Sequence, residues 1–140
     1  MLKTLNPLLT GPLLQILADM GHGDEIAIVD CNFPAATVTN RVIQIPGQTA
    51  PAVLDAVLSL FPLDDFVDQP AGVMDAPGDR PAMYSEFEAV IAAQEGRKLE
   101  LAVIDRFDFY DRTKSAFAVI SSGERRLYGN IILKKGVVRA

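Results

Sequence analysis

The chain has 140 residues and a formal net charge of −5 at pH 7, and hydrophobic residues make up 49% of it. This length and apolar content predict a single domain, residues 1–140, with a sizeable core rather than a disordered chain. The acidic balance argues against a nucleic-acid partner and against docking on an anionic membrane, because both usually require a basic surface.

The first predicted element is a helix close to the N-terminus. Thr10 can cap it, Pro12 is tolerated in its first turn, and Gly21 stands where a helix-ending glycine is expected. Its apolar positions are Leu13, Leu14, Ile16, Leu17 and Met20. The apolar stretch is interrupted by Pro7 and is too short to cross a bilayer, and no cleavage site of small residues follows it. We therefore expect a cytoplasmic protein.

Two strands and a second helix follow. Residues 25–29 (EIAIV) form a nearly continuous apolar run, which is typical of a strand buried on both faces. Residues 41–45 (RVIQI) are a second strand candidate. A helix is predicted over 50–61, opened by Thr49 and closed by Pro62.

The middle of the chain is less clear. Residues 65–76 fit either strand or loop. Residues 81–95 predict a helix that stops at Gly96. The apolar run over 99–104 predicts a strand, and 107–114 predict a short helix.

The C-terminal part predicts two more strands, over 117–120 and 130–133, joined by the turn SSGERR. Alternating helices and strands favour an α/β domain with helices on both faces of the sheet. The last connection is too short for a parallel crossover, so we expect a mixed sheet of five or six strands.

Polar side chains gather near the ends of the predicted strands. His22 lies in a glycine-flanked turn before the first strand, and Asp30 ends that strand. Arg106 follows a later strand, while Tyr128 and Asn130 precede the last one. Ligands of open α/β sheets bind outside strand ends. These groups suit a ligand rich in hydroxyls, and they predict one sugar site.

The geometry of such a site leaves two arrangements open. Starts and ends of parallel neighbours lie at opposite edges of a sheet, so the five groups do not automatically meet. Either the last strand runs antiparallel, or the site forms between subunits.

Each candidate also has an ordinary structural interpretation. His22 can be a surface residue, and Tyr128 can be a half-buried tyrosine. Asp30 can close an Asx turn. Arg106 can pair with a neighbouring aspartate, and Asn130 can stabilise its own turn.

Other kinds of site have little support. The glycine-rich motifs that bind dinucleotides or phosphates are absent, and Lys134 and Lys135 are expected to face solvent. One histidine and one cysteine cannot form an ordinary structural zinc site. Cys31 lies beside Asp30, whose charge disfavours a thiolate nucleophile. We expect no metal and no cofactor.

Two segments, 2–35 and 105–137, resemble the RbsD/FucU family of sugar mutarotases, and its L-fucose mutarotase branch in particular. The motifs that carry the resemblance are GHGDE, D-x-NFP, GE, YGNI and KKGV, in that order along the chain, with Cys31 departing from the small residue often found within the second motif. Together they are specific, although they cover about half of the chain. Residues 62–98 contribute little to the resemblance.

The resemblance implies a role for each candidate. His22 matches the catalytic histidine of the family, a proton donor. The residues matching sugar-binding positions are Asp30, Arg106, Tyr128, Gly129 and Asn130. Arg106 and Gly129 favour a fucose-like sugar, because the ribose branch differs from the fucose branch at both positions.

The resemblance also implies a fold, an activity and an assembly. The expected fold is a three-layer α/β/α domain, and the expected activity is cofactor-independent interconversion of the anomers of L-fucose or a related monosaccharide. The expected assembly is a ring-shaped homo-oligomer, commonly a decamer, with sites at subunit interfaces. Two alternatives to this activity remain open: D-ribose pyranase activity, and a non-catalytic sugar-binding role in a transport system.

Overall fold

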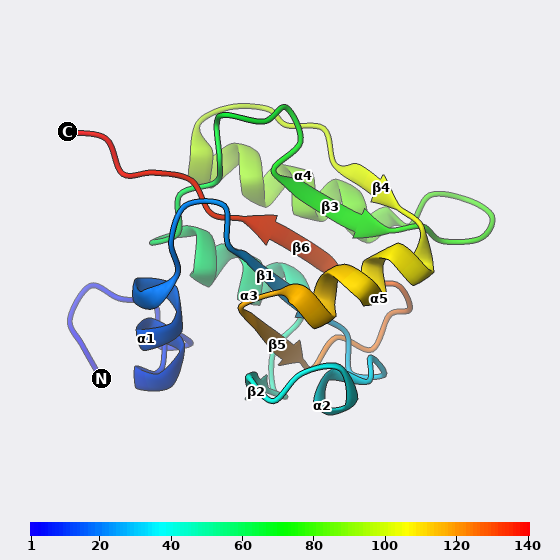
Figure 1. Ribbon diagram of the computed structural model, residues 1–140, viewed down its shortest axis with the longest axis horizontal. Coiled ribbons are helices and arrows are strands. Elements are labelled where there is room, and N and C mark those ends of the chain that lie inside the picture. Colours follow the sequence, from blue (N-terminus) through cyan, green and yellow to red (C-terminus); the bar gives the residue numbers. More distant parts are fainter.

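A computed structural model describes residues 1–140 and contains a six-stranded sheet between two layers of helices (Figure 1). The strands are β1 (Glu25–Val29), β2 (Val42–Ile45), β3 (Ala71–Met74), β4 (Ala102–Ile104), β5 (Ala118–Ser122) and β6 (Ile131–Lys134). The helices are α1 (Gly11–Asp19), α2 (Ala35–Val38), α3 (Ala50–Leu58), α4 (Ala82–Glu95) and α5 (Arg106–Ser115). The predicted three-layer α/β fold with a mixed sheet is confirmed.

The strand order is β2-β5-β1-β6-β3-β4, and β6 is the one strand that runs against its neighbours. It pairs antiparallel with both β1 and β3 (Figure 1). The start of β6 therefore lies at the sheet edge where β1, β3 and β4 end. Of the two arrangements left open by the sequence, the antiparallel last strand is present.

The core lies on both faces of the sheet, and β1 contributes to both. Ile26 and Ile28 belong to the larger apolar cluster, which α1, α3 and α4 cover. Ala27 and Val29 belong to the smaller cluster, which α2 and α5 cover. All four side chains are fully buried, which confirms that the apolar run over 25–29 is a strand buried on both faces.

The start of α3 and the end of α4 follow the sequence signals, whereas α3 ends at Leu58, before the stop expected at Pro62, and α1 lacks the expected caps. Gly96 ends α4 with a φ of 69°, a left-handed conformation that glycine adopts without steric cost. The Thr49 hydroxyl accepts a hydrogen bond from Ala52 N at 3.4 Å at the start of α3. Thr10 makes no such side-chain bond, and α1 ends at Asp19, before the expected Gly21 stop.

Lys135 caps the C-terminal end of α1 in place of a glycine. Its ammonium donates to the carbonyl oxygens of Leu17, at 2.6 Å, and Met20. A cation there also interacts favourably with the helix dipole. The expectation that Lys135 faces solvent is therefore wrong, because β6 carries the side chain to the end of α1.

Several boundaries differ from the sequence expectations. The ambiguous segment contains β3 and is otherwise irregular, and the strand expected over 99–104 shortens to β4. Helix α2 has four residues, too few to leave a helical period in the sequence. Helix α5 begins at Arg106, because the Asp105 carboxylate accepts from Phe107 N at 3.0 Å and caps it. No helix is long and apolar enough to cross a membrane.

Candidate functional site

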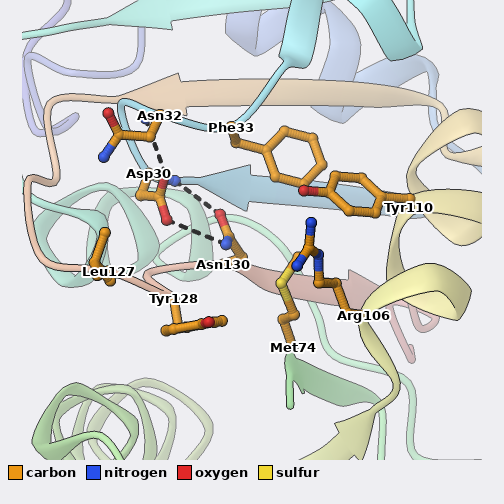
Figure 2. Close-up of a pocket in the computed structure, with 9 residues that line it drawn as sticks. All are labelled: Asp30, Asn32, Phe33, Met74, Arg106, Tyr110, Leu127, Tyr128 and Asn130. Atoms are coloured by element: carbon orange, nitrogen blue, oxygen red, sulfur yellow. Dashed lines mark hydrogen bonds between the residues drawn. The ribbon is translucent and has the colours of Figure 1, made fainter. Parts of the chain in front are cut away.

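A cavity of about 180 Å3 opens at the sheet edge where β1 and β3 end and β6 begins (Figure 2). The residues that line it are Asp30, Asn32, Phe33, Met74, Arg106, Tyr110, Leu127, Tyr128 and Asn130. Four of the predicted site residues, Asp30, Arg106, Tyr128 and Asn130, therefore line one cavity. They come from opposite ends of the chain, which the antiparallel β6 brings together.

Asp30 and Asn130, which both line this cavity, form a reciprocal hydrogen-bonded pair (Figure 2). Asp30 N donates to Asn130 Oδ1 at 2.9 Å, and Asn130 Nδ2 donates to Asp30 Oδ2 at 3.2 Å. The other carboxylate oxygen, Oδ1, accepts from Asn32 N at 2.9 Å, so the Asx turn is also present. Both side chains are buried and held in one orientation, which preorganises them for a ligand.

Arg106 projects from the first residue of α5 toward the same cavity (Figure 2). Its guanidinium carbon lies 5.6 Å from the Phe107 ring centroid and 5.9 Å from that of Tyr110. It forms no ion pair, so the structural alternative of a pairing with a nearby aspartate is not present. A guanidinium without a carboxylate partner keeps its donors free for the oxygens of a ligand.

Tyr128 and Gly129 make a tight turn just before β6. Tyr128 has a φ of 63°, a left-handed conformation that is uncommon for a residue with a side chain. A Cβ at Gly129 would lie 2.7 Å from Glu124 Cγ and 3.2 Å from Met83 Cε. The turn thus needs glycine at 129 for space, and it directs the Tyr128 ring to the cavity (Figure 2).

His22 lies at the other edge of the sheet, away from the cavity. Its turn is fixed by Gly23 N, which donates to the carbonyl of Lys135 at 2.8 Å, just beyond the end of β6. The five residues of β1 separate the two edges by roughly 15 Å, at about 3.3 Å per residue. Within one chain, His22 does not meet the other four candidates.

The RbsD / FucU transport protein family matches this chain over residues 3–138. The chain belongs to this family. A protein of Homo sapiens named fucose mutarotase is 44% identical over 146 aligned residues, which cover 98% of this chain and 94% of that protein.

Two solved structures of family members share the fold. The fucose mutarotase from Streptococcus pneumoniae, in complex with L-fucose, matches with a TM-score of 0.93 and 40% identity, over 99% of this chain and 100% of that one. The Bacillus subtilis RbsD complexed with D-ribose matches with a TM-score of 0.74 and 26% identity, over 99% and 100%. This chain is more similar to the fucose-bound structure than to the ribose-bound one.

Five residues that line the cavity of this RbsD/FucU family member were not predicted from its sequence: Asn32, Phe33, Met74, Tyr110 and Leu127. The rings of Phe33 and Tyr110 stack at a centroid distance of 5.2 Å and form an apolar wall (Figure 2). Tyr110 follows Arg106 by four residues on α5, so helical spacing could have placed the two on one face. Met74 ends a strand that the sequence left ambiguous, and nothing in the sequence singled it out.

Tyr84 supports the backbone at Met74, one of the residues that line the cavity. Its hydroxyl donates to the Met74 carbonyl oxygen, and its side chain is almost completely buried. This burial raises the pKa of Tyr84 to about 12. The phenol therefore stays protonated and keeps this hydrogen bond near neutral pH.

Glu124 supports the turn that carries Tyr128, although it does not line the cavity. This buried carboxylate accepts from Arg126 Nε at 3.0 Å and from Ala50 N, at the start of α3, at 3.4 Å. The hydrogen bond from the Arg126 guanidinium lowers the pKa of Glu124, against the opposing effect of burial. The carboxylate thus ties the turn that carries Tyr128 to the first residue of α3.

Groups suited to a metal ion are sparse in this family member. No cluster of three or more histidine, cysteine, aspartate and glutamate side chains gathers in the structure. The carboxylate in the cavity, Asp30, already has both oxygens in hydrogen bonds. The cavity is built from groups that bind hydroxyls, together with an apolar wall.

Proposed function

We propose that this protein is a mutarotase that interconverts the α and β anomers of L-fucose or a related monosaccharide. The observation that carries the proposal is the cavity itself, where a reciprocal Asp30–Asn130 pair, the unpaired guanidinium of Arg106 and the Tyr128 phenol converge. The full-length similarity to proteins named fucose mutarotase supports the same activity. In this proposal, residues 1–140 act as one mutarotase domain.

The reaction explains the kinds of residue required. An anomeric centre inverts when the hemiacetal opens, the aldehyde rotates, and the ring closes on its other face. The C1 hydroxyl loses a proton while the ring oxygen gains one, and no electron or group is transferred. A positioned acid and base suffice, and such proton transfer typically contributes about 10²–10⁴-fold.

Each candidate then has a role in the proposal. His22 exchanges protons with the sugar, because an imidazole with a reference pKa of about 6.5 acts as acid or base near neutrality. Asp30, Arg106 and Asn130 hold the sugar hydroxyls, and Gly129 shapes the turn that presents Tyr128. Tyr128 is the candidate for a second proton relay. The cavity of about 180 Å3 is smaller than a drug-sized site of about 300–1,000 Å3, as a monosaccharide requires.

The distance between His22 and the cavity calls for a second subunit. We therefore propose that His22 of one chain reaches the cavity of an adjacent chain in a ring-shaped homo-oligomer, with the decamer as the expected size. Exposed apolar residues at both edges support such a contact. Phe66, beside His22, is 64% exposed, and Leu127, at the cavity, is 67% exposed.

Anomer exchange measured by saturation-difference NMR tests the activity. The wild-type chain should exchange L-fucose anomers faster than D-ribose forms, and His22→Ala should abolish exchange while its circular dichroism spectrum stays unchanged. Faster turnover of ribose would favour the pyranase activity instead. Sugar binding without exchange would favour the accessory protein of a transport system, a role in keeping with the family's description.

Mixed assembly tests where the site forms. His22→Ala and Arg106→Ala subunits, each inactive or impaired alone, are unfolded, mixed equally and refolded together. A site shared between neighbours then recovers about one quarter of wild-type exchange, because random assembly leaves that share of sites intact. Exchange is measured at a fucose concentration well below the KM of Arg106→Ala, where a site contained in one chain shows only the residual exchange of that variant, since no chain carries both wild-type residues.

The proposal also includes the cellular location. A mutarotase of free monosaccharides works where those sugars are metabolised, and we propose the cytoplasm. Fractionation of cells that express the untagged protein, followed by immunoblotting, checks this.

A further inference from the structure

The imidazole of His22 is held by a carboxylate from a distant part of the chain. Asp64, in the loop between α3 and β3, places Oδ1 3.1 Å from His22 Nε2. The His22 side chain is 46% exposed, whereas that of Asp64 is 4% exposed. A buried carboxylate thus contacts a half-exposed imidazole. The carboxylate comes from the 62–98 segment, which contributed little to the family resemblance.

Asp64 is itself fixed in position by its backbone and side chain. Its Oδ1 also accepts from Phe66 N at 3.1 Å, and its own N donates to the Lys134 carbonyl, at the end of β6, at 3.0 Å. Arg97 Nη2 donates to the Asp64 carbonyl oxygen at 3.3 Å. The carboxylate therefore sits on a frame anchored to the sheet, rather than on a free loop.

Close packing of backbone on backbone strengthens this frame. A Cβ at Gly136 would lie 2.5 Å from the Leu63 carbonyl oxygen and 2.9 Å from Asp64 Cα. Gly136 N donates to the Pro62 carbonyl at 2.8 Å. The chain segment that bears Asp64 is thus locked against the strand that ends beside His22.

The contact selects one of the two forms of neutral imidazole. A carboxylate accepts hydrogen bonds but does not donate them, so Nε2 must carry the hydrogen that faces Asp64. The other nitrogen, Nδ1, is then the one with a free lone pair. The Phe66 ring packs against the imidazole at a centroid distance of 5.1 Å.

We propose that Asp64 is a positioning residue that fixes the orientation and tautomer of His22, so that Nδ1 is the nitrogen that exchanges protons with the sugar. The proposal rests on the proposed mutarotase function. It assigns to Asp64 no contact with the sugar, because Nε2 lies between the carboxylate and the reacting nitrogen. Its loss should therefore slow exchange more than it weakens sugar binding.

The tautomer can be measured directly, because His22 is the only histidine in the chain. Two-dimensional NMR of the untagged, ¹⁵N-labelled protein separates the two ring nitrogens. Spectra are recorded at increasing pH until the two ring-nitrogen shifts no longer change, which identifies the neutral imidazole. We expect the spectrum of the Nε2–H tautomer in the wild-type protein. The Nδ1–H tautomer would overturn the proposal without the need for any variant.

Asp64→Asn tests the consequence for exchange. An amide keeps the shape of the carboxylate but offers both a donor and an acceptor, so both tautomers should become populated. We expect kcat for fucose anomer exchange to fall by about 10–100-fold, the range typical when a metal-bound histidine loses the partner that orients it. KM should change by less than about twofold.

Asp65→Asn is the matched control, because Asp65 is the adjacent carboxylate and pairs with Arg139 at the surface. It should leave both the tautomer and kcat unchanged. Unchanged kcat and tautomer in Asp64→Asn would overturn the proposal. If Asp64→Asn does not fold, the tautomer seen in the wild-type spectrum accepts or rejects the proposal. Absence of any sugar exchange by the wild-type protein would instead reject the proposed function, while the spectrum would still accept or reject the Asp64–His22 contact.

Discussion

Arg106 supplies the one positive charge among the residues that line the cavity. Because no carboxylate neutralises it, its guanidinium donors remain available to the oxygens of a ligand. Contacts present in both the bound sugar and the transition state strengthen binding without changing the chemical step. Arg106 therefore belongs to binding rather than to proton transfer in the proposed mechanism.

Replacing Arg106 should weaken sugar binding. A hydrogen bond to a charged group contributes about 1.5–3 kcal/mol, so Arg106→Ala should raise KM for fucose by about 10–100-fold and change kcat much less. Saturation curves of anomer exchange measure both constants. Arg125→Ala is the control, because Arg125 is exposed and does not line the cavity. A normal KM in Arg106→Ala would remove this residue from the binding site.

Among single residues, the sequence identified those whose polar side chains are unusual beside an apolar strand. Asp30 and Asn130 stand out because each is polar and adjoins an apolar strand, and the structure buries both. Phe33 and Met74 resemble ordinary core residues, so composition cannot separate a cavity wall from the interior. Asp64 was missed because its partner, His22, lies 42 positions away in the sequence.

Helix α3 and the turn before β6 are joined by the Glu124 carboxylate. It accepts from Ala50 N, at the start of α3, and from Arg126 N at 2.9 Å, within the turn. An anion near a helix N-terminus is stabilising, because the first amide groups have no partner within the helix. Glu124 thus positions the element that carries Tyr128 without contacting the cavity.

Stability should depend on pH through Glu124. Its pKa lies below the ordinary value of 4.5, mainly because of the Arg126 guanidinium, so its charged form stabilises the folded state. This contribution is fully present above pH 4.5 and is lost as the pH falls through the folded-state pKa. We expect Glu124→Gln to reduce the free energy of unfolding by about 1–2 kcal/mol near neutral pH.

Thermal melts of the wild-type protein and Glu124→Gln across the acidic range check this expectation. The difference in Tm should shrink as the pH falls below the ordinary glutamate value. Glu86→Gln is the control, because Glu86 also pairs with Arg126 but is 45% exposed, and exposed ion pairs contribute little. A Tm difference that stays constant with pH would argue against a role for the Glu124 charge.

Elements with strong local signals were predictable, and those that depend on tertiary contacts were not. The apolar run of β1 predicts a strand, and Gly96 predicts the end of α4. The end of α1 was missed because its cap, Lys135, comes from the far end of the chain. β3 was ambiguous because it has only four residues, all buried, and one of them is Gly72. A Cβ at Gly72 would lie 2.5 Å from Ile104 Cδ1, so this position has no room for the side chain that would mark a strand.

The whole molecule is organised by the reversal of β6. β6 runs against β1 and β3 (Figure 1). The cavity therefore contains residues from the ends of β1 and β3 and from the start of β6, at one edge of the sheet. The same reversal carries Lys134 and Lys135 to the other edge, beside His22 and Asp64. The strand order could not be derived from the sequence, since short connections alone do not determine which strands pair.

Assembly should depend on the exposed aromatic residues at the two edges of the sheet. Phe66 adjoins His22, and Phe107 adjoins Arg106; their exposed fractions are 64% and 69%. If His22 reaches a neighbouring cavity, these rings become buried in the same contact, and a charge there is strongly unfavourable. Phe66→Glu and Phe107→Glu should each yield a smaller species by light scattering and lose fucose exchange, while circular dichroism stays unchanged.

Val138→Glu, at an 87% exposed position near the C-terminus, should change neither mass nor exchange. Full activity in a dissociated Phe66→Glu protein would mean that one chain catalyses exchange alone, and the shared site would have to be abandoned.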